Sequence, residues 1–536
     1  MWTVAQHQVN EREAALAVGA AGALYATYRL LTAVYRAGAV SRALDAQGLH
    51  RPSSTLPVLG NTLDVLFFQT HRLQDWFADE SKLSGGKPWV LSILGKAQTL
   101  VLTSPSDTED VFKRQFDVFD KGPDLTELCY DFLGNGIVAV DGEGWRQQRR
   151  AASHLFSMHM FRDVMDVVVA EKALQLRDLL AHVAQSEQRV VGLKLLLSKF
   201  TSDVFTKIGF GVDLHGLDPR NVHAAEEDAH PFLAAVSTMM ETFGARLQSP
   251  VFLLKLKRFL GLGDEGKWAK QAPVIQELVQ DIMAQALARR VAAEKAGKTT
   301  EHVEKDLVSL FAASGEMDAN TVRDAALNLF VAGKDTTSFS LSWFIVNMNR
   351  YPRVLAKLRE EIEKNLPALM TGELDAPSME DLQKLPYLEA AVRENLRLYM
   401  STVHRAPNRS TTLADGTFVP YGAHVIVPVY AASRVPEIWG PDAEEFRPER
   451  WIDEATGKLQ TVSPFKSLSF IGGPRQCLGM RFALLEMRVV LAVLLSRFDF
   501  ETVQDPAEIT YDFSMVIPVK GPLQVKVTER GAAAKA

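Results

Sequence analysis

The chain has 536 residues, of which 47% are hydrophobic and 23% charged, the composition of an ordinary globular protein with a large core. Its formal net charge of −6 gives no overall positive field, so we expect no nucleic-acid partner. The two cysteines, Cys129 and Cys477, are too few for a disulfide framework and indicate a reducing compartment or one facing it. A zinc site is not expected, because no Cys-x-x-Cys or His-Glu-x-x-His motif occurs.

The first predicted element is an apolar helix over residues 14–34, in which Arg29 is the only charge. Its length matches the hydrocarbon thickness of a bilayer, about 30 Å. Arginines follow the helix, so the positive-inside rule places the rest of the chain in the cytosol. We therefore expect an N-terminal membrane anchor and basic linker over residues 1–50. A surface helix of a soluble protein is the alternative, and a signal or transit peptide fits less well.

The body of the chain is predicted to be mostly helical. Apolar and polar residues alternate from residue 89 to 104, and the alternation is interrupted at Gly95, which predicts a hairpin. Helical patterns dominate from about residue 107 to 399, and short strand-like runs follow. The fold class is therefore mainly α with small β-sheets (α+β). We expect one catalytic domain over residues 51–525 and a C-terminal tail over 526–536.

The most informative predicted helix covers residues 320–349, and its centre reads AGKDTT. Gly333 is unfavourable inside a helix, and Thr336 is expected to bond back to the carbonyl of Ala332. A tolerated kink, with Asp335 facing solvent, is one interpretation. The other is a notch beside Gly333 that admits a diatomic ligand, to which Asp335 and Thr336 deliver protons.

A further pattern, the pair Glu394 and Arg397, has both a structural and a functional interpretation. Glu394 and Arg397 share a helix face, and such pairs usually lie at the surface and contribute little. If buried, Glu394 would bridge Arg397 and Arg450 in a rigid polar clamp.

The stretch FIGGPRQCLG places Cys477 in a glycine-rich loop before a helix-like run. The helix N-terminus, backbone N–H groups and Arg475 all favour a thiolate that ligates a metal. The alternative is a buried small hydrophobe, the usual state of a free cysteine and our interpretation of Cys129.

Together these motifs resemble those of the cytochromes P450, the haem-thiolate monooxygenases. The haem-loop pattern is matched by Phe470, Gly473, Arg475, Cys477 and Gly479. The oxygen-activation pattern is matched by Ala332, Gly333, Asp335, Thr336 and Thr337. The E-x-x-R pair with its third member is matched by Glu394, Arg397 and Arg450, and the W-x-x-x-R pattern by Trp145 and Arg149.

The resemblance implies the cytochrome P450 fold, with haem between the long central helix and the cysteine loop. It implies Cys477 as the axial ligand of the haem iron and Thr336 with Asp335 as the proton relay. The haem is expected to be haem b without a covalent link, because Ala332 stands where members with covalent haem carry Glu. The other expected cofactor-binding residues are Trp145, Arg149, His404 and Arg475 for the propionates, with Phe470, Gly473, Gly479, Ala332 and Gly333. The expected substrate contacts are Leu133, Phe330, Val403 and Met515.

The resemblance also implies the reaction and its partners. The expected activity inserts one oxygen atom of O2 into a C–H bond of a lipophilic substrate. No flavin or nicotinamide domain fits in the remaining residues, so electrons from NADPH are expected through a separate NADPH-cytochrome P450 reductase. Its expected docking side carries Arg146, Arg149, Arg150 and Lys466. The expected location is the endoplasmic reticulum membrane, with the catalytic domain facing the cytosol.

For the substrate, three stretches resemble the plant and fungal fatty-acid terminal-hydroxylase branch: residues 132–156, 200–214 and 255–268. The resemblance implies ω- or near-ω hydroxylation of fatty acids. The sequence departs from this branch at Met400, where a proline often follows R-L-Y. The alternatives are oxidation of another hydrophobic substrate (alkane, sterol or terpenoid), a non-oxygenating haem-thiolate isomerase or dehydratase, and a non-catalytic haem-binding sensor.

Overall fold

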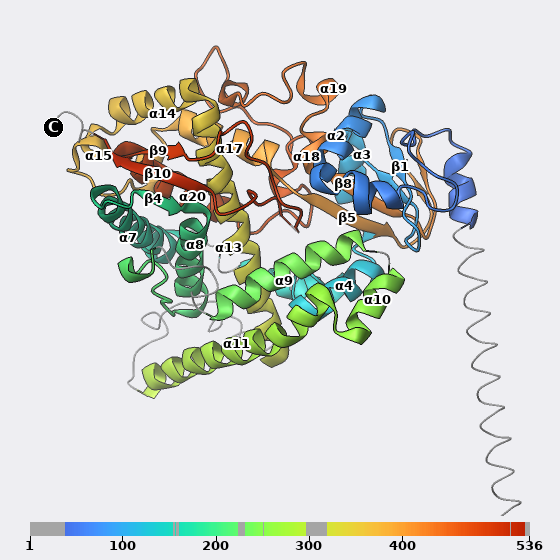
Figure 1. The fold of residues 1–536 in the computed structure, drawn as a ribbon, viewed down its shortest axis with the longest axis horizontal. Coiled ribbons are helices and arrows are strands. Elements are labelled where there is room, and N and C mark those ends of the chain that lie inside the picture. The colour runs from blue at the N-terminus through green and yellow to red at the C-terminus, as the bar shows by residue number, and fades with distance from the viewer. Residues whose placement is uncertain are drawn as a thin grey trace, which may run out of the picture.

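The computed structural model describes residues 38–153, 156, 160–222, 231–249, 251–295, 319–514 and 516–530. Helices dominate this part of the chain, and the strands form small sheets, so the predicted fold class is confirmed (Figure 1). The α-helices are α2 (Leu73–Leu83), α3 (Pro105–Glu109), α4 (Pro123–Leu133), α5 (Gly142–Ser153), α7 (Asp166–Gln185), α8 (Leu193–Phe210), α9 (Pro231–Gln248), α10 (Val251–Leu260), α11 (Gly263–Lys295), α13 (Ala319–Arg350), α14 (Pro352–Asn365), α15 (Pro367–Thr371), α16 (Met379–Leu382), α17 (Pro386–Leu398), α18 (Val429–Ala432), α19 (Pro436–Trp439) and α20 (Met480–Arg497). The strands are β1 (Trp89–Leu91), β2 (Thr99–Val101), β3 (Phe119–Asp120), β4 (Val190–Gly192), β5 (Thr402–Pro407), β6 (Thr411–Thr412), β7 (Phe418–Val419), β8 (His424–Pro428), β9 (Phe498–Thr502) and β10 (Gln524–Glu529).

The largest sheet has the strand order β1-β2-β8-β5-β3. Strands β1 and β2 are antiparallel, with Trp89 opposite Val101, and β2 runs parallel to β8. The predicted hairpin is therefore confirmed. Gly95 has a φ of 76°, a left-handed conformation that glycine adopts without strain, which explains why the alternation breaks there. A second sheet has the order β4-β10-β9, and β6 pairs with β7.

Helix α13 forms the central axis of the fold, and the prediction of a long central helix is confirmed. Its 32 residues span about 48 Å at roughly 1.5 Å per residue. In Figure 1 it runs through the middle of the molecule, between the β4-β10-β9 sheet with α7 and α8 on one side and the largest sheet on the other. Any side chain at its centre therefore lies deep inside the protein.

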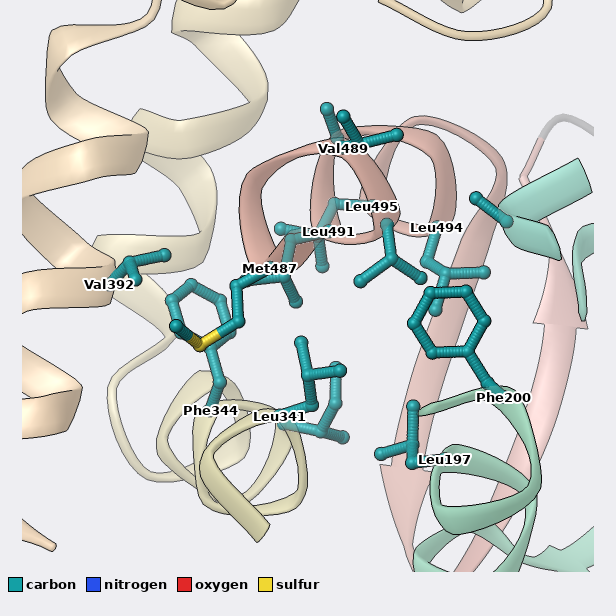
Figure 2. Packing of buried hydrophobic residues seen from close by; sticks show 14 of the residues in the cluster. Leu197, Phe200, Leu341, Phe344, Val392, Met487, Val489, Leu491, Leu494 and Leu495 are labelled. Carbon is teal, nitrogen blue, oxygen red and sulfur yellow. The ribbon is translucent and has the colours of Figure 1, made fainter. Parts of the chain in front are cut away.

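The main core lies where α20 meets α8, α13 and α17. Apolar residues of α20 are almost wholly buried, among them Met487 and Leu491 (Figure 2). They point towards Leu341 and Phe344 of α13 and Phe200 of α8. Burying a side chain of this size stabilises the fold by about 1.5–3 kcal/mol. This packing fixes the start of α20, and with it the cysteine loop, against α13.

Both ends of the predicted catalytic domain extend further than expected. Residues 38–45, which the sequence analysis assigns to the linker, form a helix that buries Val40 and Leu44 in the core beside the largest sheet. Strand β10 pairs with β9 as far as Glu529, beyond the predicted end at residue 525. The segments pack because they bury apolar side chains, a tertiary contact that local composition does not reveal.

Among the described residues, no helix is long and apolar enough to cross a membrane. The predicted anchor, residues 14–34, lies outside the described residues.

Candidate active site

Most of the predicted site residues line one cavity of about 440 Å³ between α13, β5 and the cysteine loop. The predicted residues on its wall are Trp145, Arg149, Phe330, Ala332, Gly333, Thr336, Thr337, Val403, Phe470, Arg475, Cys477 and Gly479. Three others, Leu133, His404 and Gly473, are not on this wall, and Asp335 lies behind it. We call this space the Cys477 cavity.

The loop that carries Cys477 is held by its backbone. The Cys477 N–H donates a hydrogen bond to the Phe470 carbonyl at 2.9 Å, and Ile471 and Gly473 have φ values of 56° and 75°. A Cβ on Gly473 would lie 2.0 Å from the carbonyl oxygen of Phe112. Gly473 is therefore needed for a left-handed turn and a close backbone approach to Phe112.

The Cys477 side chain lies deep in the protein, yet it is accessible because it faces the cavity. Burial raises the pKa of the thiol, while the backbone N–H groups of Gly479 and Met480 and the charge of Arg149 lower it. Arg149, and not Arg475 as expected, is the cation that acts on the sulfur. Burial is the larger of these effects, so the thiol form is favoured when no metal is bound. A positively charged metal at the sulfur would shift the balance to the thiolate.

The rim of the cavity carries stacked cations. The Arg475 guanidinium lies 4.4 Å from the ring centre of Trp145 and forms an ion pair with Asp141. Arg149 lies over the same ring at 5.7 Å. The indole thus fixes both arginines on one side of the cavity.

The structure corrects the prediction for His404. This residue lies in β5, is absent from the cavity wall, and burial lowers its pKa to about 3. Its neighbour Arg405 lines the cavity instead, over the ring of Phe112 at 5.2 Å. Successive residues of a strand point to opposite faces, so a shift of one residue exchanges histidine for arginine. The sequence alone does not reveal this exchange, because it does not fix which face of the strand lines the cavity.

A second residue that sequence reasoning missed is Lys121. Its ammonium donates to the backbone carbonyls of Ile137 at 3.1 Å and of Val138, and burial lowers its pKa well below its ordinary value. Lys121 lies between β3 and α4, where no motif marks it. Only the tertiary contact brings it to the cavity.

These side chains fit the haem that the resemblance implies. Four cations line the cavity: Lys121, Arg149, Arg405 and Arg475. The carboxylates that act on Arg475 and Arg405 are Asp120 and Asp141. Buried cations in excess of carboxylates favour an anionic ligand, and haem carries two propionates. The remaining wall is mostly apolar and Cys477 offers the sulfur ligand, so Cys477 would hold the iron and the cations the propionates.

Thr336 lines the cavity from α13. Its hydroxyl donates to the Ala332 carbonyl at 2.6 Å, the back-bond expected from the sequence. With the proton directed to Ala332, the lone pairs of Oγ1 are free to accept a hydrogen bond from the cavity side.

Asp335 lies behind the cavity wall rather than on it. Asp335 is buried, and its Oδ1 accepts from the Lys334 ammonium at 2.7 Å while its Oδ2 has no hydrogen-bond partner. The Asp335 side chain does not face solvent, so the interpretation that places Asp335 at the protein surface is wrong.

The space beside Gly333 differs from the expected open notch. A Cβ there would lie 1.9 Å from Cζ of Phe205, a residue of α8. Gly333 therefore allows an aromatic ring to pack directly on α13, and the open part of the wall is at Ala332 and Thr336. The contact joins residues far apart in sequence, so the AGKDTT motif alone does not reveal it.

Glu394 bridges Arg397 and Arg450, as the clamp interpretation requires. It accepts from Arg397 Nε at 2.8 Å and from Arg450 Nε at 2.8 Å, and Trp451 Nε1 donates to it at 2.9 Å. Arg397 and Glu394 are fully buried. Arg397 also donates to the Ala443 carbonyl at 2.8 Å. The network joins α17 to the segment that leads into the cysteine loop.

Two of the predicted substrate contacts, Phe330 and Val403, line the Cys477 cavity. Leu133 does not, because it ends α4 within the core and its carbonyl accepts a hydrogen bond from Asn328. Met515 lies outside the described residues.

The expected docking residues are divided between surface and interior. Arg146 and Arg150 are exposed on α5. Lys466 lies 4.8 Å from the ring centre of Trp439, and Arg149 turns towards the Cys477 cavity. Arg149 is therefore removed from the docking surface.

Glu486 of α20 is a fully buried acid whose carboxyl group interacts with Thr337 of α13. Burial raises its pKa well above the ordinary 4.5, and the Thr337 hydroxyl offsets this only in part. The unfolded chain releases the proton at lower pH than the folded protein does. The contribution of Glu486 to stability therefore falls as pH rises above 4.5.

We predict that Glu486→Gln stabilises the protein relative to the parent, increasingly so from about pH 5 to about pH 8, because amide does not titrate. The slope is at most about 1.4 kcal/mol per pH unit. Urea unfolding at both pH values measures it, and Glu360→Gln, at an exposed position, is the control. A difference that is independent of pH would contradict the prediction.

Comparison with known proteins identifies the family. The family model for cytochrome P450 matches residues 51–527. The chain belongs to the cytochrome P450 family. Among the relatives of this P450, cytochrome P450 CYP94D108 of Paris polyphylla is 31% identical over 488 residues, which cover 90% of this chain and 93% of that protein. Cytochrome P450 94B3 of Arabidopsis thaliana is 31% identical over 483 residues, 88% and 91% of the two chains. Cytochrome P450 94A1 of Vicia sativa is 29% identical over 467 residues, 85% and 87%.

As a cytochrome P450, the protein is a monooxygenase that uses haem and O2, takes electrons from a reductase and acts on a hydrophobic substrate. The predicted family, fold and enzyme class are therefore confirmed. Neither a non-oxygenating enzyme nor a haem sensor accounts as well for a Thr336 that lines the same cavity as Cys477.

Proposed function

We propose that this P450 hydroxylates fatty acids at or near the ω carbon. The observation that carries the proposal is the Cys477 cavity, whose wall is mostly apolar, with cations on its rim and a few hydroxyl and amide side chains, among them Thr336 and Ser340 of α13. Such a wall excludes polar substrates and accepts an alkyl chain. The resemblance of residues 132–156, 200–214 and 255–268 to the fatty-acid terminal-hydroxylase branch supports the same substrate class.

The chain's own residues have separate tasks in this reaction. Haem, when bound, supplies the activation of O2 and the insertion of one oxygen atom into a C–H bond. Cys477 provides the sulfur ligand, and Arg149, Arg405 and Arg475 would bind the propionates. Phe330 and Val403 exclude water and orient the alkyl chain. Thr336 Oγ1 holds a proton position on the cavity wall, with Asp335 as its buried neighbour.

We infer that the cofactor is haem b without a covalent link, because Ala332 has no carboxylate with which to form an ester. The electron donor is proposed to be NADPH-cytochrome P450 reductase. Arg146 and Arg150, exposed on α5, would attract acidic groups of this partner.

We further propose that the protein lies on the endoplasmic reticulum membrane with the catalytic domain facing the cytosol. Besides the predicted anchor over residues 14–34, large apolar side chains are exposed in two segments near the N-terminus and in α10. Val58 is 88% exposed, Phe67 67% and Phe259 86%, values that water disfavours and a lipid surface would accommodate. Flotation with phospholipid vesicles tests this, and full recovery in the unbound fraction would contradict it.

We predict that Thr336→Ala lowers the product formed per electron consumed by about tenfold or more; the upper bound is the roughly 10²–10⁴-fold that a proton-transfer group contributes. The electrons would appear in hydrogen peroxide, because Oγ1 no longer holds a proton at the cavity wall. Peroxide and product measured against NADPH consumption give the ratio. Ser342→Ala removes a similar back-bonded hydroxyl on α13 away from the cavity and is the matched control. Unchanged coupling in Thr336→Ala would remove this residue from the relay.

The substrate proposal is tested with purified holoenzyme, reductase and NADPH. A mixed panel of fatty acids, alkanes, sterols and terpenoids is supplied, and the products are identified by mass spectrometry. The proposal predicts hydroxy fatty acids with the hydroxyl at or next to the ω carbon. Products from the sterols or terpenoids alone would replace the substrate class while leaving the monooxygenase assignment intact.

A further inference from the structure

A polar cavity of about 380 Å³ lies apart from the Cys477 cavity, where α18 and the C-terminal ends of α13 and α17 meet α2. Its volume lies within the roughly 300–1,000 Å³ that small-molecule sites occupy. Charged and tyrosine side chains make up most of its described wall, and none of these wall residues belongs to the wall of the Cys477 cavity. Such a wall does not suit a lipophilic substrate. We call this space the Arg434 cavity.

Arg434 is the most buried cation on this wall. It follows α18 and is only 9% exposed. One guanidinium nitrogen, Nη1, donates to the carbonyls of Leu398 at 2.8 Å and Tyr430 at 3.0 Å, and the guanidinium lies 3.4 Å from the ring centre of Tyr430. Within the described part of the chain, Nε and Nη2 have no hydrogen-bond acceptor. Their N–H groups are therefore available to a ligand in the cavity.

Arg350, the last residue of α13, supplies a second cation. Its three guanidinium nitrogens donate to the Pro506 and Ile509 carbonyls and to the Tyr399 hydroxyl, at 2.6–3.1 Å. Arg434 lies 5.9 Å from the ring centre of Tyr399. The two arginines thus flank one tyrosine on the cavity wall.

Each carboxylate on the wall of the Arg434 cavity has another partner. Asp79 pairs with Arg72, and Glu444 pairs with Lys82. Asp75 accepts hydrogen bonds from two tyrosine hydroxyls, at 2.7 and 2.8 Å. In the part of the chain that the structure describes, neither of the two flanking arginines forms an ion pair. The fold therefore leaves two cations here without a carboxylate.

Backbone carbonyls offset these two charges only in part. The Leu398 carbonyl ends α17, and the dipole at a helix C-terminus is equivalent to about half a negative charge. A buried charge without full compensation is unfavourable, and an anionic ligand would remove this penalty. An oxyanion suits arginine in particular, because the planar guanidinium pairs with two oxygens at once.

We propose that the Arg434 cavity binds a small oxyanion, a phosphate or carboxylate group, through the free N–H groups of Arg434 and the charge of Arg350. This site is separate from the hydroxylation reaction, and the inference does not depend on which substrate is oxidised. A bound anion would hold α2, α13, α17 and α18 together and so stabilise the folded protein. Leu396 of α17 and Val429 of α18 line the Cys477 cavity, so the anion would stabilise elements that also form the active-site wall.

The test uses purified holoenzyme with inorganic phosphate, pyrophosphate and malonate as probes, and chloride at equal ionic strength as the reference. Calorimetric titration gives the Kd, and thermal unfolding gives the Tm. We expect saturable binding and a higher Tm, with no change in the Soret band because the site lies away from the haem. Tighter binding of pyrophosphate than of malonate would support a phosphate ligand, and the reverse order a carboxylate ligand.

Three variants separate anion binding from folding and from surface charge. Arg434→Gln should raise the Kd about tenfold or more, because hydrogen bonds from a charged group are lost. Asp79→Asn should lower the Kd, because it frees Arg72 from its ion pair and removes a negative charge from the wall. The Asp79 side chain is 46% exposed, so this variant should fold even where Arg434→Gln does not. Arg409→Gln removes an exposed arginine outside the cavity and should behave as the parent.

Four results would overturn the inference. The first is a parent protein that binds none of the probes saturably. The second is an unchanged Kd in folded Arg434→Gln or, where that variant does not fold, an unchanged or higher Kd in Asp79→Asn. The third is an equal loss of binding in Arg409→Gln, which would indicate non-specific attraction to surface charge. The fourth is a shift of the Soret band by the probes, which would place the anion at the haem.

Discussion

Replacing Cys477 with alanine is expected to abolish the red-shifted Soret band of the ferrous carbon monoxide complex and to reduce product formation to background. The sulfur of Cys477 faces the cavity; burial raises the pKa of the thiol, the backbone N–H groups of Gly479 and Met480 offset this in part, and bound iron would stabilise the thiolate as its ligand. Alanine removes the ligand without adding a side chain that blocks the cavity. The band is recorded on purified protein after reduction with dithionite and exposure to carbon monoxide.

The chain supplies a matched control in its other cysteine. Cys129 is a residue of α4 that is buried in the hydrophobic core. Burial raises the pKa of its thiol to about 11, so the thiolate form is disfavoured. Cys129→Ala should keep the red-shifted band and most of the activity. If the band survived in Cys477→Ala, or disappeared only in Cys129→Ala, the ligand assignment would be wrong.

The second large effect is expected at the buried clamp. Glu394→Gln should lower the free energy of unfolding by about 3–5 kcal/mol, because two arginines then remain buried without their carboxylate. Arg397 is fully buried and its other hydrogen bonds go to the backbone carbonyls of Ser433, Ala443 and Glu445, so water cannot replace the lost charge. Urea unfolding of parent and variant measures the difference, and haem content per protein should fall in parallel.

A surface ion pair gives the comparison for the clamp. Lys384 pairs with Asp381 at 2.8 Å and its side chain is 55% exposed, so Lys384→Gln should change stability by no more than about 1 kcal/mol. Equal effects of the two substitutions would mean that the clamp contributes no more than an ordinary surface pair.

The elements and motifs that depend on local pattern were predictable from the sequence. The long apolar run around AGKDTT predicts α13, and the break at Gly95 predicts the β1–β2 hairpin. The fixed spacings of FIGGPRQCLG and of Glu394 with Arg397 place their side chains correctly because each spacing lies within one loop or one helix turn. In these cases, the geometry of one helix turn or one loop is sufficient to predict where the side chains lie.

Features created by contact between distant segments were not predictable. Phe205 fills the space beside Gly333, and the Phe112 carbonyl is what requires glycine at Gly473. Arg405 takes the place expected for His404 because strand register decides which residue faces the cavity. In each case, the deciding partner comes from an element that the motif does not contain.

The same reason explains the missed domain ends and Lys121. Val40 and Leu44 belong to the globular body only because the largest sheet offers them a place to pack. Lys121 reaches the Cys477 cavity from the connection between β3 and α4, which has no recognisable pattern.

The most direct test of the account is the source and position of the oxygen in the product. Purified holoenzyme, reductase and NADPH are incubated with a fatty acid under isotopically heavy oxygen gas, and the product is analysed by mass spectrometry. The account predicts one heavy oxygen atom, located in a hydroxyl at or next to the ω carbon, with product absent without the reductase. Oxygen derived from water, or product that forms equally well without reductase and O2, would contradict it.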